Sequence, residues 1–242
     1  MNEQFSGNVV LVCGGTGALG RAVSLAFLEQ GAAVLVTYRQ QGELDELKRA
    51  ASASTNATRL DGQAIDVTNE AAMKRFLEGI VAKHGRLDIV VNTVGAFAGG
   101  AKLWEEDASV FEQMLLANLR SGYAISRAVI PHMLEQKPLK QKRGAFINIA
   151  SRAAIDHAAG VASYAASKAA AVALMDSLAA ELKGTGVRVN SVLPTIIDTE
   201  ANRKAMPKAD FAQWPKPEEI ARVILFLASD DAKLIHGASI PV

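Results

Sequence analysis

Short runs of apolar, often β-branched residues alternate with longer segments of helical period along the 242-residue chain. The runs are apolar at consecutive positions, not at alternate ones, which is typical of parallel strands buried on both faces. This alternation predicts an α/β fold: one doubly wound parallel sheet of about seven strands with helices on both faces. The expected strands are 9–13, 33–38, 63–67, 87–92, 145–150, 187–193 and 238–242, and the expected helices are 18–30, 43–53, 70–84, 108–135, 161–183 and 217–229.

Two segments depart from this alternation. Residues 137–143 form a basic connection, which is most simply a solvated loop. Residues 195–215 show no clean period, and so long an irregular segment inside a compact domain is more often functional than idle. We expect that segment to be a substrate lid. Because no linker or repeat divides the chain, the sequence predicts one domain over residues 1–242.

Composition excludes several classes of protein. With 26 basic and 25 acidic residues the net charge is +1, which does not suit a nucleic-acid or membrane-surface protein. The longest apolar stretch, 169–175, is too short to span a bilayer, and the first residues lack the pattern of a signal peptide. Cys13 is the single cysteine, and the four histidines show no metal-ligand spacing. We therefore expect a cytoplasmic protein without a metal that acts on a small molecule.

A glycine cluster follows the first expected strand directly. Glycines at a strand-to-helix turn let the backbone approach a pyrophosphate, and the helix N-terminus adds N–H donors and a positive dipole. A glycine-rich turn alone is a weak signal, but its place after the first strand favours a dinucleotide site on a Rossmann fold. The expected cofactor contacts here are Gly14, Thr16, Gly17, Ala18, Leu19 and Gly20.

The end of the second strand bears on which dinucleotide is bound. NAD enzymes usually place an acid there to bind the ribose 2′-hydroxyl. This chain has no acid at that point and has Arg39 instead, whose guanidinium suits a 2′-phosphate. The sequence thus predicts NADP(H) in preference to NAD(H). Further contacts are expected where the third and fourth strands end, at Asp66, Val67, Asn92, Val94 and Gly95.

Candidate chemistry lies at the end of the fifth strand and in the helix after it. Ser151 closes that strand, and Tyr164 and Lys168 follow four residues apart, on one face of a helix. A neighbouring ammonium favours phenolate, so we expect the pKa of Tyr164 to fall below its free value of about 10. Such a phenol could exchange a proton with an alcohol or carbonyl oxygen to which Ser151 donates a hydrogen bond. A Tyr–Lys pair alone means little, because such pairs are common on exposed helices.

With these features combined, the chain resembles the short-chain dehydrogenase/reductase family over essentially its whole length. The matching residues are the glycine turn, Asp66, Asn92-Thr-Val-Gly95, Asn118, Ser151, Tyr164, Lys168 and the stretch from Pro194 to Thr199. The resemblance implies a catalytic tetrad of Asn118, Ser151, Tyr164 and Lys168. Tyr164 would be the general acid/base and would also contact the cofactor, and Lys168 would bind the nicotinamide ribose and tune the phenol.

The same resemblance assigns further roles. Asn118 would hold a water of a proton relay through its main chain, while Pro194, Ile197 and Thr199 would lie against the nicotinamide half of the cofactor. It also implies a homotetramer or homodimer built on the two helices that carry Asn118 and Tyr164.

Departures from the family pattern keep other functions open. Cys13, Ala18 and Thr195 replace a threonine and two glycines that the family usually has. Parts of the C-terminal third are similar to dihydropteridine reductases, but that branch generally lacks the serine. We therefore prefer carbonyl or alcohol chemistry, with reduction of a quinonoid pterin and a non-catalytic NADP-binding sensor or scaffold as alternatives. Substrate-pocket candidates are Phe97, His157 and Trp214.

Overall fold

The computed structural model describes residues 3–138 and 144–242. Within them, seven parallel strands form one sheet in the order β3-β2-β1-β4-β5-β6-β7. Every residue of β1 is buried, as expected of a central strand covered on both faces. The strands are β1 (Val9–Cys13), β2 (Ala33–Tyr38), β3 (Leu60–Ala64), β4 (Ile89–Asn92), β5 (Gly144–Ile149), β6 (Val187–Leu193) and β7 (Ser239–Pro241).

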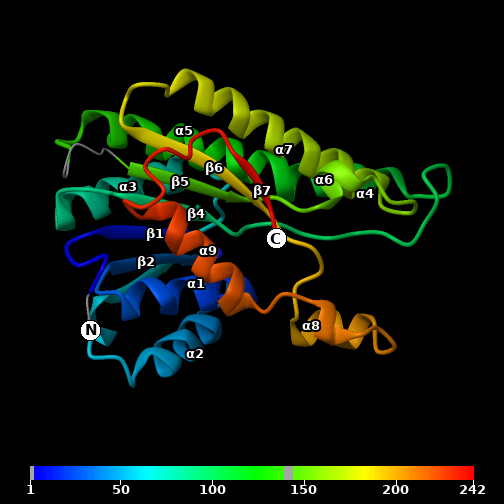
Figure 1. The fold of residues 1–242 in the computed structure, drawn as a ribbon, viewed down its shortest axis with the longest axis horizontal. Helices are drawn as coiled ribbons and strands as arrows, with labels where there is room; N and C mark the ends of the chain where they lie inside the picture. The colour runs from blue at the N-terminus through cyan, green and yellow to red at the C-terminus, as the bar shows by residue number, and fades with distance from the viewer. Residues whose placement is uncertain (1–2, 139–143) are drawn as a thin grey trace.

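Helices cover both faces of this sheet (Figure 1). One apolar cluster packs α1 (Ala18–Glu29), α2 (Gln41–Ala51) and α9 (Pro217–Ala228) against the strands. A second cluster packs α3 (Glu70–His84), α5 (Ser121–Glu135) and α7 (Ala162–Glu181) against the other face. This arrangement confirms the predicted doubly wound Rossmann architecture. In the described part of the chain, no helix is both long and apolar enough to cross a membrane.

The third strand lies three residues earlier than predicted, at Leu60–Ala64 instead of 63–67. It forms the edge of the sheet beside β2, and three of its five residues are exposed. An edge strand buries little of its surface, so it tolerates residues 61–62 (Asp-Gly). Because of these two residues, the strand does not form a continuous apolar run in the sequence. Asp66 and Val67 therefore follow this strand instead of closing it.

The predicted helix 108–135 is interrupted by a change of helical geometry. It consists of α4 (Ala108–Met114), a π-helical segment η2 (Leu115–Arg120) and α5. π-Helical turns are rare and are frequently found at functional sites. Asn118 lies within η2 and is buried.

The segment 195–215 is less irregular than expected, since it contains a short helix α8 (Glu200–Ala205) and a 3-10 turn η3 (Phe211–Gln213). Another short helix, α6 (Ala153–Asp156), was also not predicted. All three are too short to show a helical period in the sequence. The predicted basic loop falls mostly outside the described residues, at 139–143.

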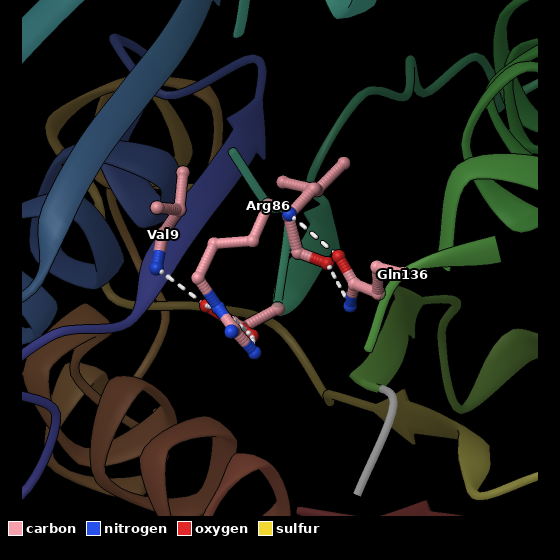
Figure 2. Close-up of polar contacts among 5 residues, drawn as sticks. Val9, Arg86 and Gln136 are labelled. Atoms are coloured by element: carbon pink, nitrogen blue, oxygen red, sulfur yellow. Dashed lines mark hydrogen bonds and ion pairs between the residues drawn. The ribbon is translucent and has the colours of Figure 1, made fainter. Parts of the chain in front are cut away.

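A network of polar contacts lies at the amino-terminal ends of β1 and β4 (Figure 2). Asp88 is 5% exposed and accepts hydrogen bonds from the backbone N–H of Val9 (2.8 Å) and from Nε of Arg86 (2.8 Å). Beside it, the amide of Gln136 exchanges two hydrogen bonds with the backbone of Leu87, both 2.9 Å long. The network thus joins β1, the start of β4 and the end of α5.

Replacing Asp88 by alanine should lower the free energy of unfolding by about 2 to 4 kcal/mol, because a buried N–H and a guanidinium lose their shared acceptor. Urea denaturation measures this. Glu78→Ala is the control, because its pair with Lys74 is exposed and 4.0 Å long; it should cost less than about 0.5 kcal/mol. Equal losses in the two variants would contradict the assigned role of Asp88.

Candidate active site

β1 and β4 lie side by side, and the strand order runs from them toward opposite edges of the sheet. The candidate site begins at this point. Ligands of doubly wound sheets bind at the carboxyl ends of the strands at this switch point. A cavity of about 310 Å³ opens there. Eight predicted cofactor residues line it: Gly14, Thr16, Gly17, Arg39, Asp66, Val67, Val94 and Gly95.

Close packing explains why the turn between β1 and α1 needs glycine. Gly14 has a φ of +76°, which disfavours a side chain. A Cβ on Gly15 would lie 2.4 Å from the Val36 side chain, and one on Gly20 would lie 2.1 Å from the carbonyl oxygen of Gly14. The N-terminus of α1 is therefore held against β1, and Gly17, the residue that caps the helix, lines the cavity at the end of the helix that favours a pyrophosphate.

Other predicted cofactor residues lie outside the cavity lining. Leu19 and Gly20 are buried behind the turn, and Ala18 is the exposed first residue of α1. Asn92 is also buried, and its amide bonds to Asn148 (2.9 Å) and to the N–H of Val94 (3.1 Å). The side chain of Asn92 thus fixes the backbone that directly follows β4.

The three predicted contacts after β6 also lie apart from this cavity. The carbonyl of Pro194 accepts the N–H of Arg152 (2.9 Å), which ties the ends of β6 and β5 together. Ile197 packs against the apolar core, and the Thr199 hydroxyl caps α8 by accepting the N–H of Asn202 (3.2 Å). Contact between these three residues and a cofactor stays a prediction.

The prediction from sequence missed an acid at the adenosine end. No carboxylate stands at the end of β2, but Glu43 in the first turn of α2 lines the same cavity as Arg39. Its carboxylate accepts a hydrogen bond from the Thr16 hydroxyl (2.9 Å). The sequence carries no local signal for this residue, because Glu43 reaches the cavity only through the position of α2 beside the glycine turn.

Ser151, Tyr164 and Lys168 come together as predicted. Tyr164 lies in the first turn of α7, and its phenol shares a hydrogen bond with the Ser151 side chain. The ammonium of Lys168 lies 6.0 Å from the centre of the Tyr164 ring and donates to the carbonyl oxygen of Ile149 (3.2 Å). One helix therefore presents the phenol and the ammonium to the end of β5.

Burial shifts both pKa values, and one shift is opposite to our expectation. The pKa of Tyr164 is raised above 10, because burial penalises phenolate more than the hydrogen bond from Ser151 stabilises it. Burial also lowers the pKa of Lys168 to about 8, since its ammonium is desolvated. The predicted lowering of the tyrosine pKa by the lysine is therefore wrong for the protein without cofactor. Desolvation is the larger effect.

Asn118 connects the loop after β4 to α7. Its side-chain oxygen accepts the N–H of Ala96 (2.9 Å), and its amide donates to the carbonyl of Ala96 (3.0 Å) and to the hydroxyl of Ser167 (3.0 Å). A Cβ on Gly95 would lie 2.8 Å from the Asn118 oxygen and 3.1 Å from the Lys168 ammonium. The side chain of Asn118 thus fixes the backbone that faces Lys168.

The three pocket candidates have different surroundings. Phe97 is 68% exposed and packs edge-on against the Tyr164 ring, with centroids 5.0 Å apart. His157 is exposed and has a φ of +46°, the only positive value of a non-glycine residue in the described chain. Trp214 instead packs on Phe211 within the predicted lid, 5.0 Å between centroids. Of the three candidates, only Phe97 therefore contacts the Tyr164 ring.

Comparison with known proteins identifies the family. The short chain dehydrogenase family matches residues 8–210. The chain belongs to this family. It is 31% identical to the 3-oxoacyl-[acyl-carrier-protein] reductase FabG of Thermotoga maritima over 99% of this chain and 97% of that protein. It is 30% identical to meso-2,3-butanediol dehydrogenase of Serratia marcescens, over 99% of this chain and 94% of that one.

Solved structures of other proteins share the fold. A short-chain type dehydrogenase/reductase from Mycobacterium ulcerans has a TM-score of 0.91 and 25% identity, covering 99% of this chain and 89% of that one. ElxO with NADP bound has a TM-score of 0.87 and 26% identity, covering 97% and 96%. This short-chain dehydrogenase is thus an NAD(P)-dependent oxidoreductase of the family that acts on CH–OH and C=O groups.

The cavity of this short-chain dehydrogenase fits such a cofactor. The side-chain-free turn at Gly14 and Gly15 and the helix end at Gly17 can hold a pyrophosphate. Gly95, which has no room for a side chain, borders both the cavity and Lys168. A dinucleotide that runs from Arg39 past the glycine turn to Gly95 would therefore end beside Lys168.

Proposed function

We propose that this short-chain dehydrogenase catalyses NADP(H)-dependent oxidation and reduction of a ketone, aldehyde or secondary alcohol, with Tyr164 as general acid/base. The observation that carries the proposal is the hydrogen bond between the Tyr164 phenol and Ser151, with the Lys168 ammonium one helical turn away. Two relatives are named as a 3-oxoacyl-[acyl-carrier-protein] reductase and a meso-2,3-butanediol dehydrogenase, and these names support this substrate class.

A nicotinamide cofactor held in the cavity by Arg39, the glycine turn and Gly95 would supply or accept the hydride. Tyr164, protonated at neutral pH, donates its phenolic proton to the substrate oxygen during reduction and accepts a proton during oxidation. Ser151 donates a hydrogen bond to the same oxygen and orients it. The buried Lys168, whose pKa of about 8 lies near neutrality, can pass a proton toward the phenol. We propose that a water held by the Asn118 main chain links Lys168 to solvent.

Two observations support NADP(H) over NAD(H). Arg39 stands at the end of β2, where its guanidinium can pair with a 2′-phosphate, and β2 itself ends without an acid. The similar structure of ElxO contains NADP. Pro194, Ile197 and Thr199 would then reach the nicotinamide half if the segment after β6, the proposed lid, closes over the cavity.

We further propose a cytoplasmic homotetramer or homodimer built on the helices that carry Asn118 and Tyr164. Large apolar side chains are exposed along α4, η2 and α5 and the loop before them: Leu103, Trp104, Phe111, Leu116 and Tyr123. Apolar patches of this kind often mark contact surfaces. Sedimentation of the purified chain would test the assembly.

The function is tested by following NADPH oxidation at 340 nm with a panel of ketones and aldehydes and with a quinonoid dihydropterin. We expect turnover of at least one carbonyl compound, and a loss of about 10² in kcat for Ser151→Ala on that substrate. A pterin activity that persists in Ser151→Ala, without carbonyl turnover, would instead assign pteridine reduction. Tight NADPH binding without turnover of any compound would assign a sensor or scaffold.

A further inference from the structure

The adenosine end of the cavity carries charges of both signs. Arg39 contributes a cation, and Glu43 and Asp66 contribute carboxylates. Asp66 is bonded to its own turn, because its carboxylate accepts the backbone N–H (2.9 Å) and the hydroxyl (2.7 Å) of Thr68. Glu43 instead comes from α2, on the far side of Arg39 in the sequence. Asp66 also interacts electrostatically with Arg39, but Glu43 is the carboxylate in this lining that bonds to the glycine turn.

Glu43 is fixed across the cavity to the glycine turn. Its carboxylate accepts the hydroxyl of Thr16, which is only 5% exposed and lies between Gly15 and Gly17. In Rossmann sites the ribose of the adenosine lies between the glycine turn and the end of the second strand. The hydrogen bond between Thr16 and Glu43 runs from the glycine turn to the first turn of α2, which follows β2 and Arg39, so it borders the space where the ribose 2′-substituent would be held.

A carboxylate in this place favours one cofactor over the other. It can accept a hydrogen bond from a ribose 2′-hydroxyl, but it repels a 2′-phosphate, which carries up to two negative charges. A phosphate here would also compete for the Thr16 hydroxyl that Glu43 now holds. Arg39 and Glu43 therefore act in opposite directions on the same substituent.

We infer that Glu43 is a specificity-determining residue that opposes binding of the 2′-phosphate of NADP(H) and accepts the 2′-hydroxyl of NAD(H). The short-chain dehydrogenase thus binds both dinucleotides, and Glu43 sets the ratio of their affinities against Arg39. This inference rests on the proposed cofactor cavity, and it is independent of which residue moves the proton.

Calorimetric titration of the full chain with NADP⁺ and with NAD⁺ tests the inference without turnover. Glu43→Gln should change the ratio of the two dissociation constants by about tenfold in favour of NADP⁺. Adenosine 2′,5′-bisphosphate and 5′-AMP, which lack the nicotinamide, should show the same change. Arg39→Ala should shift the ratio in the opposite direction.

Glu46→Gln is the matched control. Glu46 lies on the same helix and loses the same charge, but it is exposed and pairs with Arg21 (3.3 Å) away from the cavity lining. It should change the ratio by less than about twofold, because exposed charges are screened. Melting temperatures verify folding, and Glu43→Ala repeats the test without an amide that could still hold Thr16.

The inference would be overturned if the Glu43 variants changed the ratio of the two dissociation constants no more than Glu46→Gln does. A shift of this ratio toward NAD⁺ in the Glu43 variants would also overturn it. Failure of the proposed function looks different. Without turnover of any carbonyl compound, the proposed activity would fall while the effect of Glu43 on the two dissociation constants could still be measured. A wild-type chain that binds neither dinucleotide would overturn the inference as well.

Discussion

Tyr164→Phe should lower kcat for carbonyl reduction by a factor of about 10² to 10⁴, because the substrate oxygen loses its proton donor. The ring and its edge-on contact with Phe97 are retained, so the shape of the pocket should change little. The hydroxyl does not line the cofactor cavity, so the dissociation constant for NADPH should stay within about threefold of wild type. Steady-state kinetics and NADPH titration of the same preparation measure both.

Tyr123→Phe is the control for this variant. Tyr123 is 43% exposed on α5, and its hydroxyl accepts a hydrogen bond from Arg127 (3.4 Å), away from the site. It should keep kcat within about twofold of wild type. Full activity of Tyr164→Phe would refute the role of this phenol as acid/base, even if the chain turns over carbonyl compounds.

Lys168→Met should abolish most activity and yet stabilise the protein without cofactor by about 2 to 3 kcal/mol at pH 7. The lysine is 5% exposed, and its pKa is about 8 in the folded chain against 10.5 for a free side chain. Below pH 8 the folded protein must therefore keep a desolvated charge, which methionine of similar length lacks. The stabilisation and the loss of kcat would be measured by urea denaturation and by the carbonyl assay.

The pH dependence of the difference in unfolding free energy between Lys168→Met and wild type gives a sharper test. Between pH 8 and 10.5 the unfolded chain binds more protons at Lys168 than the folded chain does, so wild-type stability rises with pH in that window. The advantage of Lys168→Met should therefore be largest below pH 8 and shrink toward pH 10.5. Lys183→Met, at an exposed lysine just beyond α7, should show no such dependence. A destabilised Lys168→Met at pH 7 would contradict this interpretation.

Much of the fold was predictable because the central strands are buried on both faces, and such strands appear in the sequence as continuous apolar runs. The glycine turn and the Tyr164–Lys168 spacing were also visible, since close backbone packing and helix geometry restrict residue type at fixed intervals. Ser151 could be placed because it directly ends such a run. These are local signals, and local signals can be read from one sequence.

Features that depend on tertiary surroundings were not predictable. The edge strand β3 is too exposed to show an apolar run in the sequence. The π-helical turn at Asn118 is too short to show a hydrophobic period that differs from that of an α-helix. Glu43 could not be assigned to the cavity before α2 was placed beside the glycine turn. The direction of the Tyr164 pKa shift depends on how deeply the phenol is buried, which residue spacing does not reveal.

The most direct test of the proposed function uses NADPH carrying two deuterium atoms at nicotinamide C4, with a ketone that the enzyme turns over. Mass spectrometry of the alcohol should find one deuterium on the new carbinol carbon in every turnover, while Tyr164→Phe forms this product about 10² to 10⁴ times more slowly. Alcohol without deuterium, or labelled alcohol formed by Tyr164→Phe at the wild-type rate, would contradict hydride transfer with Tyr164 as the proton donor.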